Sequence, residues 1–454
     1  GKTVVGDCFE IFFTKAEIGQ NMPLAGGLNT LFVTLVVNIN VLASQSTSID
    51  ITGLSNAVAS SSVTLSNVAG GNSSADIFGG SAAFGSNKLT LQLASGQTMA
   101  KDTTYIFSFN IVNPSAAQAA PAISVQAVGR VSTAKMAMTN PSSATIRGVS
   151  GGNAPLYVFL PTFNSQSIVQ SMPLAGGDNK LTVTFQANVD IISASRITVN
   201  GLTGAQTAST SSLTITNQSP SGIFGTNGVW TKTTGRLVLT VATAGLTKNT
   251  NYVFSFTVQN QATAQSALTP TLSASIECGA TDAPIAATTL TTSSTTVHGV
   301  ANGARPFLVL VPAFTVISLG QSHPAVSANT VITATLQANA VMLTGTKVTL
   351  SGLTGSQTAD TSTALTMSSS GAFSTLPTWV KTSGSLSFTS LSDLPIAQYV
   401  VSFTLRNAAT AQASPSVSVS GAIECGVNDA PFASIAATKP GATVLGHPGG
   451  GAPM

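Results

Sequence analysis

The residue types that could bind a metal or act as acid and base gather at one place, which is present twice. The stretch Ile-Glu-Cys-Gly occurs at 276–279 and again at 423–426, and Asp-Ala-Pro follows each copy. Two carboxylates fall short of the about six oxygen ligands that calcium takes. The cysteines have no CxxC spacing and no adjacent histidine, which argues against zinc. We interpret both stretches as loops whose aspartate forms a turn. The first part of the chain reads Gln-Ala-Val-Gly at 126–129 in the corresponding place.

The remaining candidates for chemistry are dispersed. Three histidines lie far apart, at 298, 323 and 447, and no P-loop occurs. The 454 residues include 17 basic and 14 acidic side chains, 7% charged in all, with a formal net charge of +3. Phosphate binding needs clustered Lys and Arg. The sequence therefore predicts a protein that is not an enzyme, holds no cofactor or metal, and does not bind nucleic acid.

Aromatic residues recur at fixed places and allow two interpretations. Tyr105, Tyr252 and Tyr399 each open a Tyr-x-x-Ser-Phe stretch, and Trp230 corresponds to Trp379, with Phe84 as the counterpart near the start. Regular aromatics can stack on sugars. Alternatively, they pack in a core, as a tyrosine corner does in β-sandwiches by bonding its hydroxyl to backbone. We predict core packing for both sets.

These matches belong to a threefold internal repeat. Met-Pro-Leu-Ala-Gly-Gly occurs at 22–27 and 172–177, and Gly-Leu-Thr-Gly at 201–204 and 352–355. Gly-rich linkers stand at 148–155, 299–306 and 446–453. We predict domains at 1–147, 148–298 and 299–445. Residues 446–454 would be a linker and the start of a truncated fourth repeat or connector. Asn113, Asn260 and Asn407 repeat as well, and we expect them to form turn hydrogen bonds.

Each unit has the pattern of β-strands. Leu181, Val183 and Phe185 alternate with polar residues, and the other two units have the same alternation. Turn residues separate such runs, and no helical period is sustained. The predicted fold class is therefore all-β, with three tandem immunoglobulin-like antiparallel β-sandwich domains joined by Gly-rich linkers. A jelly roll is the alternative architecture.

The composition indicates an extracellular protein. Charges are few, Ser and Thr are abundant, and only three cysteines occur, at 8, 278 and 425. Asn72 and Asn217 lie in Asn-x-Ser/Thr sequons, which makes them glycosylation candidates. The longest apolar runs are strand-sized, so no membrane span is expected. We predict a secreted or cell-surface chain that carries covalent glycans.

A resemblance supports this interpretation. The stretch Val-Thr-Leu-Ser-Gly-Leu-Thr-Gly-Ser-Gln-Thr at 348–358, with residues 230–232 and 252–256, resembles tandem repeats of large cell-surface and extracellular proteins of unicellular algae and other protists. It covers the second and third units well and the first loosely, since Gly-Leu-Ser-Asn at 53–56 replaces the Gly-Leu-Thr-Gly core. The resemblance implies repetitive, glycosylated extracellular material and no transferable activity.

The predicted function is that of a building block of an extracellular filament, surface appendage or coat, which assembles head to tail with copies of itself. The alternatives are an adhesin or glycan-binding stalk module and a viral or phage fibre protein. An apolar segment from Phe9 to Phe13 is the candidate to cross between copies. Cys8 could form a disulfide with Cys425, and Met454 lies where each earlier linker enters the next strand.

Overall fold

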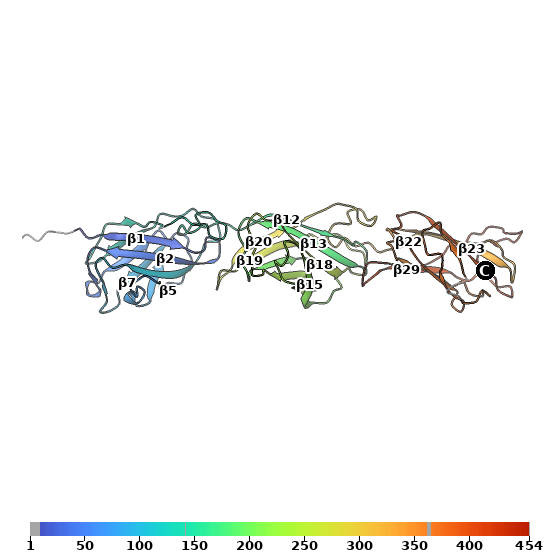
Figure 1. The fold of residues 1–454 in the computed structure, drawn as a ribbon, viewed down its shortest axis with the longest axis horizontal. Coiled ribbons are helices and arrows are strands. Elements are labelled where there is room, and N and C mark those ends of the chain that lie inside the picture. Colours follow the sequence, from blue (N-terminus) through green and yellow to red (C-terminus); the bar gives the residue numbers. More distant parts are fainter. Residues whose placement is uncertain (1–9, 141, 361–364, 454) are drawn as a thin grey trace, which may run out of the picture.

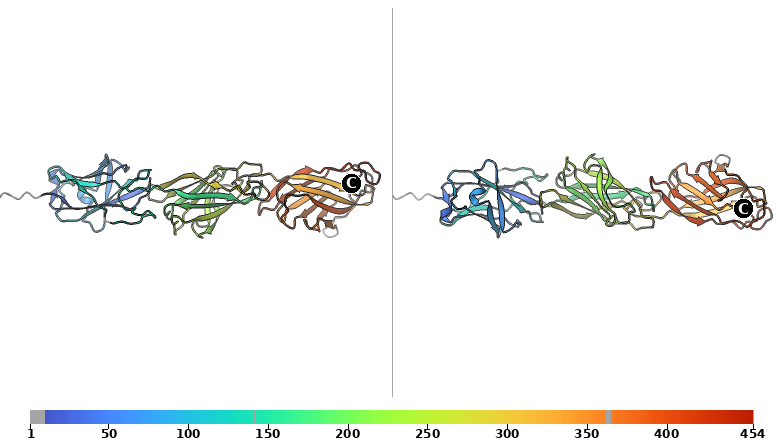
Figure 2. Two further views of the ribbon diagram at one scale, coloured as in Figure 1. Left: turned by 90° about the horizontal axis from the view of Figure 1, so that it is seen from above. Right: turned by 90° about the horizontal axis from the view of Figure 1, so that it is seen from below.

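The computed structural model describes residues 10–140, 142–360 and 365–453. They form three β-sandwich domains that follow one another in a row, so the molecule is elongated (Figures 1 and 2). The only helical segments among the described residues are two 3-10 turns, η1 (Ala43–Gln45) and η2 (Asp76–Phe78). The predicted all-β, three-sandwich fold is confirmed. No helix in the described part of the chain is long and apolar enough to cross a bilayer.

Domain 1 has two sheets that share a corner strand. The sheet order is β1-β2-β9-β5-β6-β7-β4-β10-β11. One end of β5 pairs with β9 and the other end with β6, so β5 passes from one sheet to the other. The strands are β1 (Phe13–Gln20), β2 (Leu28–Val37), β3 (Val41–Leu42), β4 (Ser48–Thr52), β5 (Ser62–Asn67), β6 (Ser81–Gly85), β7 (Lys88–Gln92), β8 (Thr98–Met99), β9 (Tyr105–Val112), β10 (Ser124–Val128) and β11 (Met136–Ala137).

Domain 2 repeats this topology, with β15 as the strand that both sheets share. Its order is β20-β19-β14-β17-β16-β15-β18-β13-β12-β21. The strands are β12 (Phe163–Gln170), β13 (Asp178–Ala187), β14 (Arg196–Asn200), β15 (Thr210–Ser219), β16 (Asn227–Thr231), β17 (Arg236–Thr240), β18 (Tyr252–Gln259), β19 (Thr271–Ile276), β20 (Ala283–Thr289) and β21 (Thr291–Thr292).

Domain 3 has the same two layers as separate sheets, β22-β23-β28-β25 and β26-β27-β24-β29-β30. Its strands are β22 (Phe314–Gln321), β23 (Asn329–Ala338), β24 (Lys347–Ser351), β25 (Met367–Ser368), β26 (Thr378–Val380), β27 (Ser385–Thr389), β28 (Tyr399–Arg406), β29 (Ser418–Ile423) and β30 (Ala430–Ala436).

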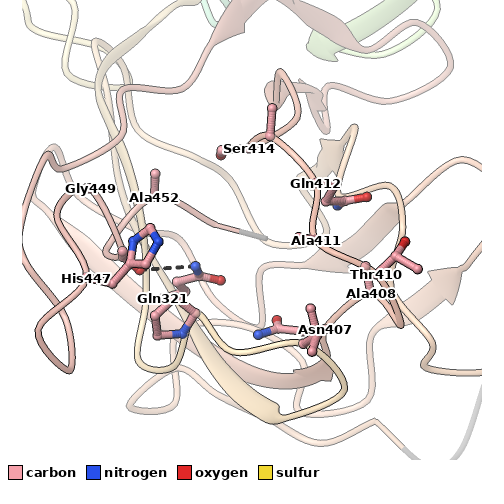
Figure 3. Close-up of a pocket in the computed structure, with 14 residues that line it drawn as sticks. Gln321, Asn407, Ala408, Thr410, Ala411, Gln412, Ser414, His447, Gly449 and Ala452 are labelled. Carbon is pink, nitrogen blue, oxygen red and sulfur yellow. Dashed lines mark hydrogen bonds between the residues drawn. The ribbon is translucent and has the colours of Figure 1, made fainter.

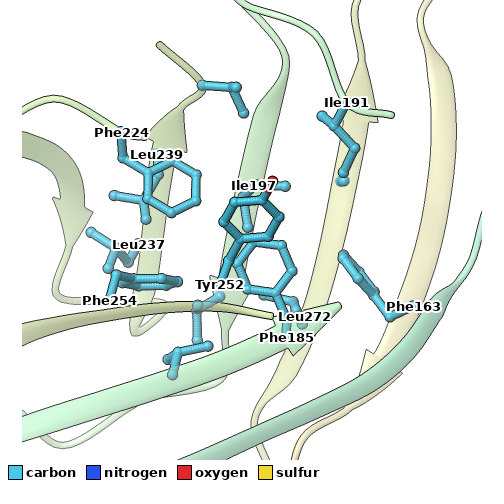
Figure 4. Packing of buried hydrophobic residues seen from close by; sticks show 14 of the residues in the cluster. Phe163, Phe185, Ile191, Ile197, Phe224, Leu237, Leu239, Tyr252, Phe254 and Leu272 are labelled. Carbon is cyan, nitrogen blue, oxygen red and sulfur yellow. The ribbon is translucent and has the colours of Figure 1, made fainter. Parts of the chain in front are cut away.

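Period-two alternation places one face of each strand in the core. Leu181, Val183 and Phe185 of β13 are fully buried, as are their counterparts in β2 and β23. In domain 2, Phe185 meets Phe163 edge to face and lies beside Tyr252 (Figure 4). Burial of apolar side chains from both sheets is the main term that holds the two layers together.

The repeated aromatics pack inward. Trp230 and Trp379 are each 1% exposed, and their indole N–H groups donate to the carbonyls of Thr207 (3.1 Å) and Thr358 (3.2 Å). Phe84 pairs with Leu89 as Trp230 pairs with Leu237, which places it in the equivalent position. Neither tryptophan is available as a sugar platform.

The tyrosines share one register but differ in burial. Tyr105 and Tyr252 are buried, and their hydroxyls accept the backbone N–H of Ala100 (2.7 Å) and Thr247 (2.6 Å). Tyr399 is only half-buried. Its hydroxyl donates to the carbonyl of Pro395 at 2.8 Å.

Strand register corrects one sequence alignment. Ala127 in β10, Ala274 in β19 and Gly421 in β29 face equivalent residues of the neighbouring strand. Residues 126–129 therefore do not correspond to 276–279. In this register Val131, which is buried, takes the place of Cys278. The error arose because the loop after β10 has a different sequence and carries no matching motif.

Candidate assembly site at the domain junctions

Each junction is built around the Met-Pro-Leu-Ala-Gly-Gly loop, which joins β1 to β2 in domain 1. A segment that follows the first Gly-rich linker lies extended beside this loop. The Phe159 N–H donates to the Pro23 carbonyl (2.7 Å), and the Phe159 carbonyl accepts the Ala25 N–H (2.9 Å). On the other side, Val158 and Gln118 exchange two backbone hydrogen bonds of 2.9 and 2.8 Å. Residues 156–159 are thus held between two loops of domain 1. The domain boundary at 147/148 stays a prediction.

A buried polar network fixes this segment. The Gln20 side-chain oxygen accepts the Leu156 N–H (2.8 Å), and its amide nitrogen donates to the Gly152 carbonyl (2.9 Å). Asn29 donates to both Gln20 (2.8 Å) and Asn113 (2.9 Å). All three amide side chains are at most 4% exposed. Buried polar groups that all find partners stabilise one unique arrangement.

The same network holds the second junction. Gln170 accepts the Phe307 N–H at 2.7 Å, and Asn179 donates to Gln170 (2.8 Å) and Asn260 (2.9 Å). The Asn260 amide in turn donates to the carbonyls of the loop at 172–174. The prediction that the repeated asparagines bond to a turn is confirmed, although the turn lies on another loop.

Apolar contacts tie each loop to the following domain. Met22 and Leu24 belong to the core cluster of domain 2, and Met172 and Leu174 to that of domain 3. The Cys278 sulfur lies 3.6 Å from the Met22 sulfur, and the Cys425 sulfur lies 3.6 Å from the Met172 sulfur. The repeated Ile-Glu-Cys-Gly stretch therefore contacts the preceding domain in both places.

The second glycine of the loop lies very close to the next domain. A Cβ at Gly27 would lie 3.0 Å from the Ala283 Cβ and 3.1 Å from the Cys278 sulfur. A Cβ at Gly177 would lie 3.0 Å from the Cys425 sulfur. Contacts this short are tighter than nine in ten real Cβ contacts, so a larger residue at either position requires the next domain to give way by a few tenths of an ångström.

Burial at the junctions suppresses thiol ionisation. Desolvation raises the pKa of Cys278 to about 11 and that of Cys425 to about 12. Both thiols are free. Because a thiolate is the reactive form, these are inert packing residues in the folded chain.

The second junction has an additional polar contact. Asp178, the first residue of β13, accepts the backbone N–H groups of Val427 (3.1 Å) and Asn428 (3.2 Å) and the Asn428 side-chain amide (2.8 Å). Its own N–H donates to the Asn428 carbonyl. At the first junction Leu28 occupies this place and makes only the backbone bond, to the Thr281 carbonyl at 2.8 Å.

The other predicted site residues are spread along the chain. Asn72 is exposed, and the backbone of Asn217 belongs to β15. Phe13 is buried in the core of its own domain, where it pairs with Val37. Cys8, Phe9 and Met454 lie outside the described residues, so the predicted disulfide between Cys8 and Cys425 stays a prediction.

Two further kinds of chemical site can be compared with the described part of the chain. It contains no group of three or more His, Cys, Asp or Glu that could hold a metal ion. Residues 148–152 have the Gly-x-Ser-x-Gly spacing of hydrolase nucleophiles, but they form turns of the linker and not a strand-to-helix elbow.

The sequence showed the repeated loop motif but not its role. Gln20 and Gln170 were missed altogether. Their only signal was a polar residue at an inward position of β1 and β12, where alternation calls for an apolar one.

Comparisons with known proteins yield distant matches. No protein-family model and no curated protein sequence matches the chain. Among solved structures, the C-terminal domain of the Streptococcus pyogenes antigen I/II-family protein AspA matches with TM-score 0.31 and 8% identity, covering 61% of this chain and 98% of that one. The N-terminal domain of the Streptococcus gordonii adhesin Sgo0707 matches with TM-score 0.20 and 9% identity, covering 96% and 94%. A C-terminal fragment of the Streptococcus agalactiae major pilin GBS80 matches with TM-score 0.20 and 9% identity, covering 61% and 90%.

These three proteins are bacterial, and they give no support to the expected resemblance to algal and protist proteins. Likenesses this distant are consistent with a β-rich fold and carry no argument about function.

Proposed function

We propose that this chain is a structural protein of the cell exterior, a stiff segment of a filament, surface appendage or coat. One observation carries the proposal: both junctions join neighbouring domains by the same backbone hydrogen bonds and shared core contacts. A chain of independent domains needs only flexible linkers. Here the linker is bonded along its length, which suits a rod that bears load or spans distance.

The surface chemistry supports an extracellular setting. With 7% charged residues, a rod has little electrostatic protection from self-association. Glycans would supply that protection. Asn72 is exposed in a loop of domain 1 and can be reached by a glycosylating enzyme. We propose covalent sugars at Asn72 and Asn217, and the intact mass of material from the native source should exceed the mass of the bare chain.

Small-angle X-ray scattering tests the stiffness. The expected distance distribution is that of three domains in line, with a sharp maximum dimension that does not change between low and high salt. A broad distance distribution, as expected for domains joined by flexible linkers, would refute the proposal.

An adhesin or glycan-binding stalk is the second candidate function. The repeated tryptophans do not support this function, because Trp230 and Trp379 are buried and cannot stack on a sugar. A glycan array probed with the labelled chain separates the two functions, since the structural protein is expected to bind no glycan.

A further inference from the structure

The second Gly-rich linker is folded against the domain that precedes it. It begins after Thr292, where β21 pairs in parallel with β12 of domain 2. Near its other end, Gln170, the last residue of β12, donates its side-chain amide to the Gly303 carbonyl (2.9 Å) and its N–H to the Ala304 carbonyl (3.1 Å). Residues 293–306 therefore start and finish beside the same strand.

The linkers of domains 1 and 3 fold back in the same way. Gln20 donates its side-chain amide to the Gly152 carbonyl at 2.9 Å. Gln321 donates to the Gly450 carbonyl at 3.1 Å, and Figure 3 shows this bond as a dashed line. Each linker is thus a loop closed on the first strand of its own domain, and its residues do not span the distance between two domains.

The chain leaves domain 2 through residues 307–310, which we call the anchor segment. Phe307 is fully buried and belongs to the core cluster of domain 2, whereas Leu310 packs against the core of domain 3. Between them, Val309 exchanges two backbone hydrogen bonds of 2.9 and 3.0 Å with Gln265. Tension between the two domains therefore enters the chain at Phe307. The linker before it carries no tension while the anchor segment stays in place.

The anchor residue has a strained backbone at both junctions. Phe307 has a φ of +57°, and Leu156, its counterpart in the first junction, has a φ of +56°. Bulky side chains rarely adopt this left-handed conformation, which persists only where the surrounding contacts enforce it. Leu156 is fully buried in the core cluster of domain 1, as Phe307 is in that of domain 2. Withdrawal of either residue from its core relieves the strain.

We propose that the linkers store length, which tension on the rod releases by withdrawing Leu156 or Phe307 from the preceding domain before any sandwich unfolds. The inference rests on the proposed structural function and gives the rod a way to lengthen while its domains stay folded. At the second junction, residues 293–306 supply up to about 5 nm of chain, since an extended residue spans about 3.5 Å.

The order of the two events follows from the contacts that each must break. Release of the linker frees the anchor segment and withdraws Met172 and Leu174 from the core of domain 3. Unfolding of domain 2 must instead break the β12–β13 ladder, which runs from Phe163 to Gln170, and open the whole core between the sheets. Forced opening is governed by the rate of the step that is broken, so the smaller set of contacts yields first.

Stretching the full chain by its two ends in an optical trap tests the proposal. We expect short extensions at low force, followed by long extensions as the sandwiches unfold. Ten Gly and Ser residues inserted after Ser294, which is exposed, should lengthen one short extension by about 3.5 nm. X-ray scattering of the same variant should show an unchanged length at rest, because the inserted residues join a loop that is closed on domain 2.

Substitution of the anchor residues identifies the step. Phe307→Ala should lower the force of the short extension at the second junction about two-fold, and Leu156→Ala that at the first, because each leaves a cavity where the anchor was held. Phe373→Ala is the matched control. Phe373 is equally buried but lies between Phe388 and Tyr399 inside domain 3, so its loss should weaken one long extension only.

Three results would overturn the proposal. They are a chain that shows long extensions only, short extensions that keep their length after the insertion, and short extensions whose force is unchanged in both anchor variants. The insertion replaces no buried residue, so it decides the matter even if Phe307→Ala does not fold. Scattering of the unstretched parent chain reports the rod independently, so each of these results leaves the proposed function standing.

Discussion

The two junctions inside the chain share one backbone frame and differ in side-chain contacts. Both have the linker segment bonded to the loop, the Gln–Asn–Asn network and the Cys–Met contact. They differ where β2 and β13 begin, with Leu28 at the first junction and Asp178 at the second. Leu28 is close to Gly279, and Asp178 accepts three hydrogen bonds from the loop at 427–428.

This difference shows which parts of a junction are fixed. An apolar contact and a charged, hydrogen-bonded contact occupy the same place without changing the frame. The geometry of a junction therefore depends on the backbone hydrogen bonds, the buried amides and the close glycines. The residue at the start of β2 or β13 adjusts the stability of the junction. The following variants test that ranking, beginning with the largest expected effect.

Replacing the asparagine that bonds to both other amides of the network, Asn29 or Asn179, should destabilise the two junctions equally. Asn179→Leu leaves Asn260 without its donor and Gln170 with one fewer, and Asn29→Leu does the same in domain 1. We expect a loss of about 2–4 kcal/mol in each case, since each buried group left unpaired costs about 1–3 kcal/mol. Calorimetry gives the loss, and hydrogen exchange assigns it to the altered domain. Asn227→Leu, at an exposed site on β16, is the control. A loss below 1 kcal/mol would show that the network is dispensable.

Filling the close glycines should loosen the rod while leaving the sandwiches folded. Gly27→Val and Gly177→Val each place a side chain within 3.1 Å of the next domain. Overpacking of this kind costs about 1–3 kcal/mol, and separating the domains relieves it. Scattering should show a broader distribution of lengths. Gly85→Val, where a Cβ meets nothing within 4 Å, should scatter as the parent chain does. An unchanged distribution in both junction variants would contradict this account.

Exchanging the variable contact should change one junction only. Asp178→Leu removes three hydrogen bonds, and we expect the second junction to weaken by about 1 kcal/mol because the site is partly solvated. Leu28→Asp at the first junction should be tolerated. Protease cleavage at the linkers, measured as a rate, reports each junction separately. If the cleavage rate at the second linker is the same in Asp178→Leu as in the parent chain, Asp178 contributes nothing to that junction.

Completing the network in domain 3 should stabilise it. Thr330→Asn supplies the donor that the Asn407 oxygen lacks, as Asn29 and Asn179 do in the other domains. The expected gain is about 1 kcal/mol, the usual net value of one hydrogen bond. The melting temperature of the domain-3 transition measures it, and Thr330→Val, which adds no donor, serves as the comparison. A destabilised Thr330→Asn chain would show that domain 3 has adapted to threonine.

Thiol reactivity should report junction opening. Burial raises the pKa of Cys278 to about 11 and of Cys425 to about 12, so the folded thiols stay protonated at pH 8 and alkylate slowly. Between the ordinary thiol pKa of about 8.5 and these values, the unfolded chain loses a proton that the folded chain keeps, so the free energy of unfolding falls as pH rises. Iodoacetamide should react much faster with Cys425 in Gly177→Val than in the parent chain. Equal rates would mean that the thiols are already accessible.

Much of the fold followed from the sequence because its signals are local. The alternation of Leu181, Val183 and Phe185 fixes which face of β13 is buried, since successive side chains of a strand point to opposite sides. The repeated Tyr and Trp positions were predicted as packing residues for the same reason. The sequence did not reveal that Val131 corresponds to Cys278. The loop after β10, which contains Val131, shares no residue motif with the loop after β19, which contains Cys278.

The sequence by itself determined three similar β-sandwiches in one chain, with Gly-rich stretches between them. Only the tertiary structure decided that these stretches are parts of hydrogen-bonded junctions between the domains. Gln20 reaches Gly152 across 132 residues of sequence, and Met22 reaches Cys278 across 256. Contacts at such separations depend on how whole domains pack. Neither the alternation of apolar residues along a strand nor a repeated motif predicts which residues make them. The physical reason is that hydrophobic alternation specifies which side of a strand avoids water, whereas a junction requires two surfaces to match in shape and in hydrogen bonds.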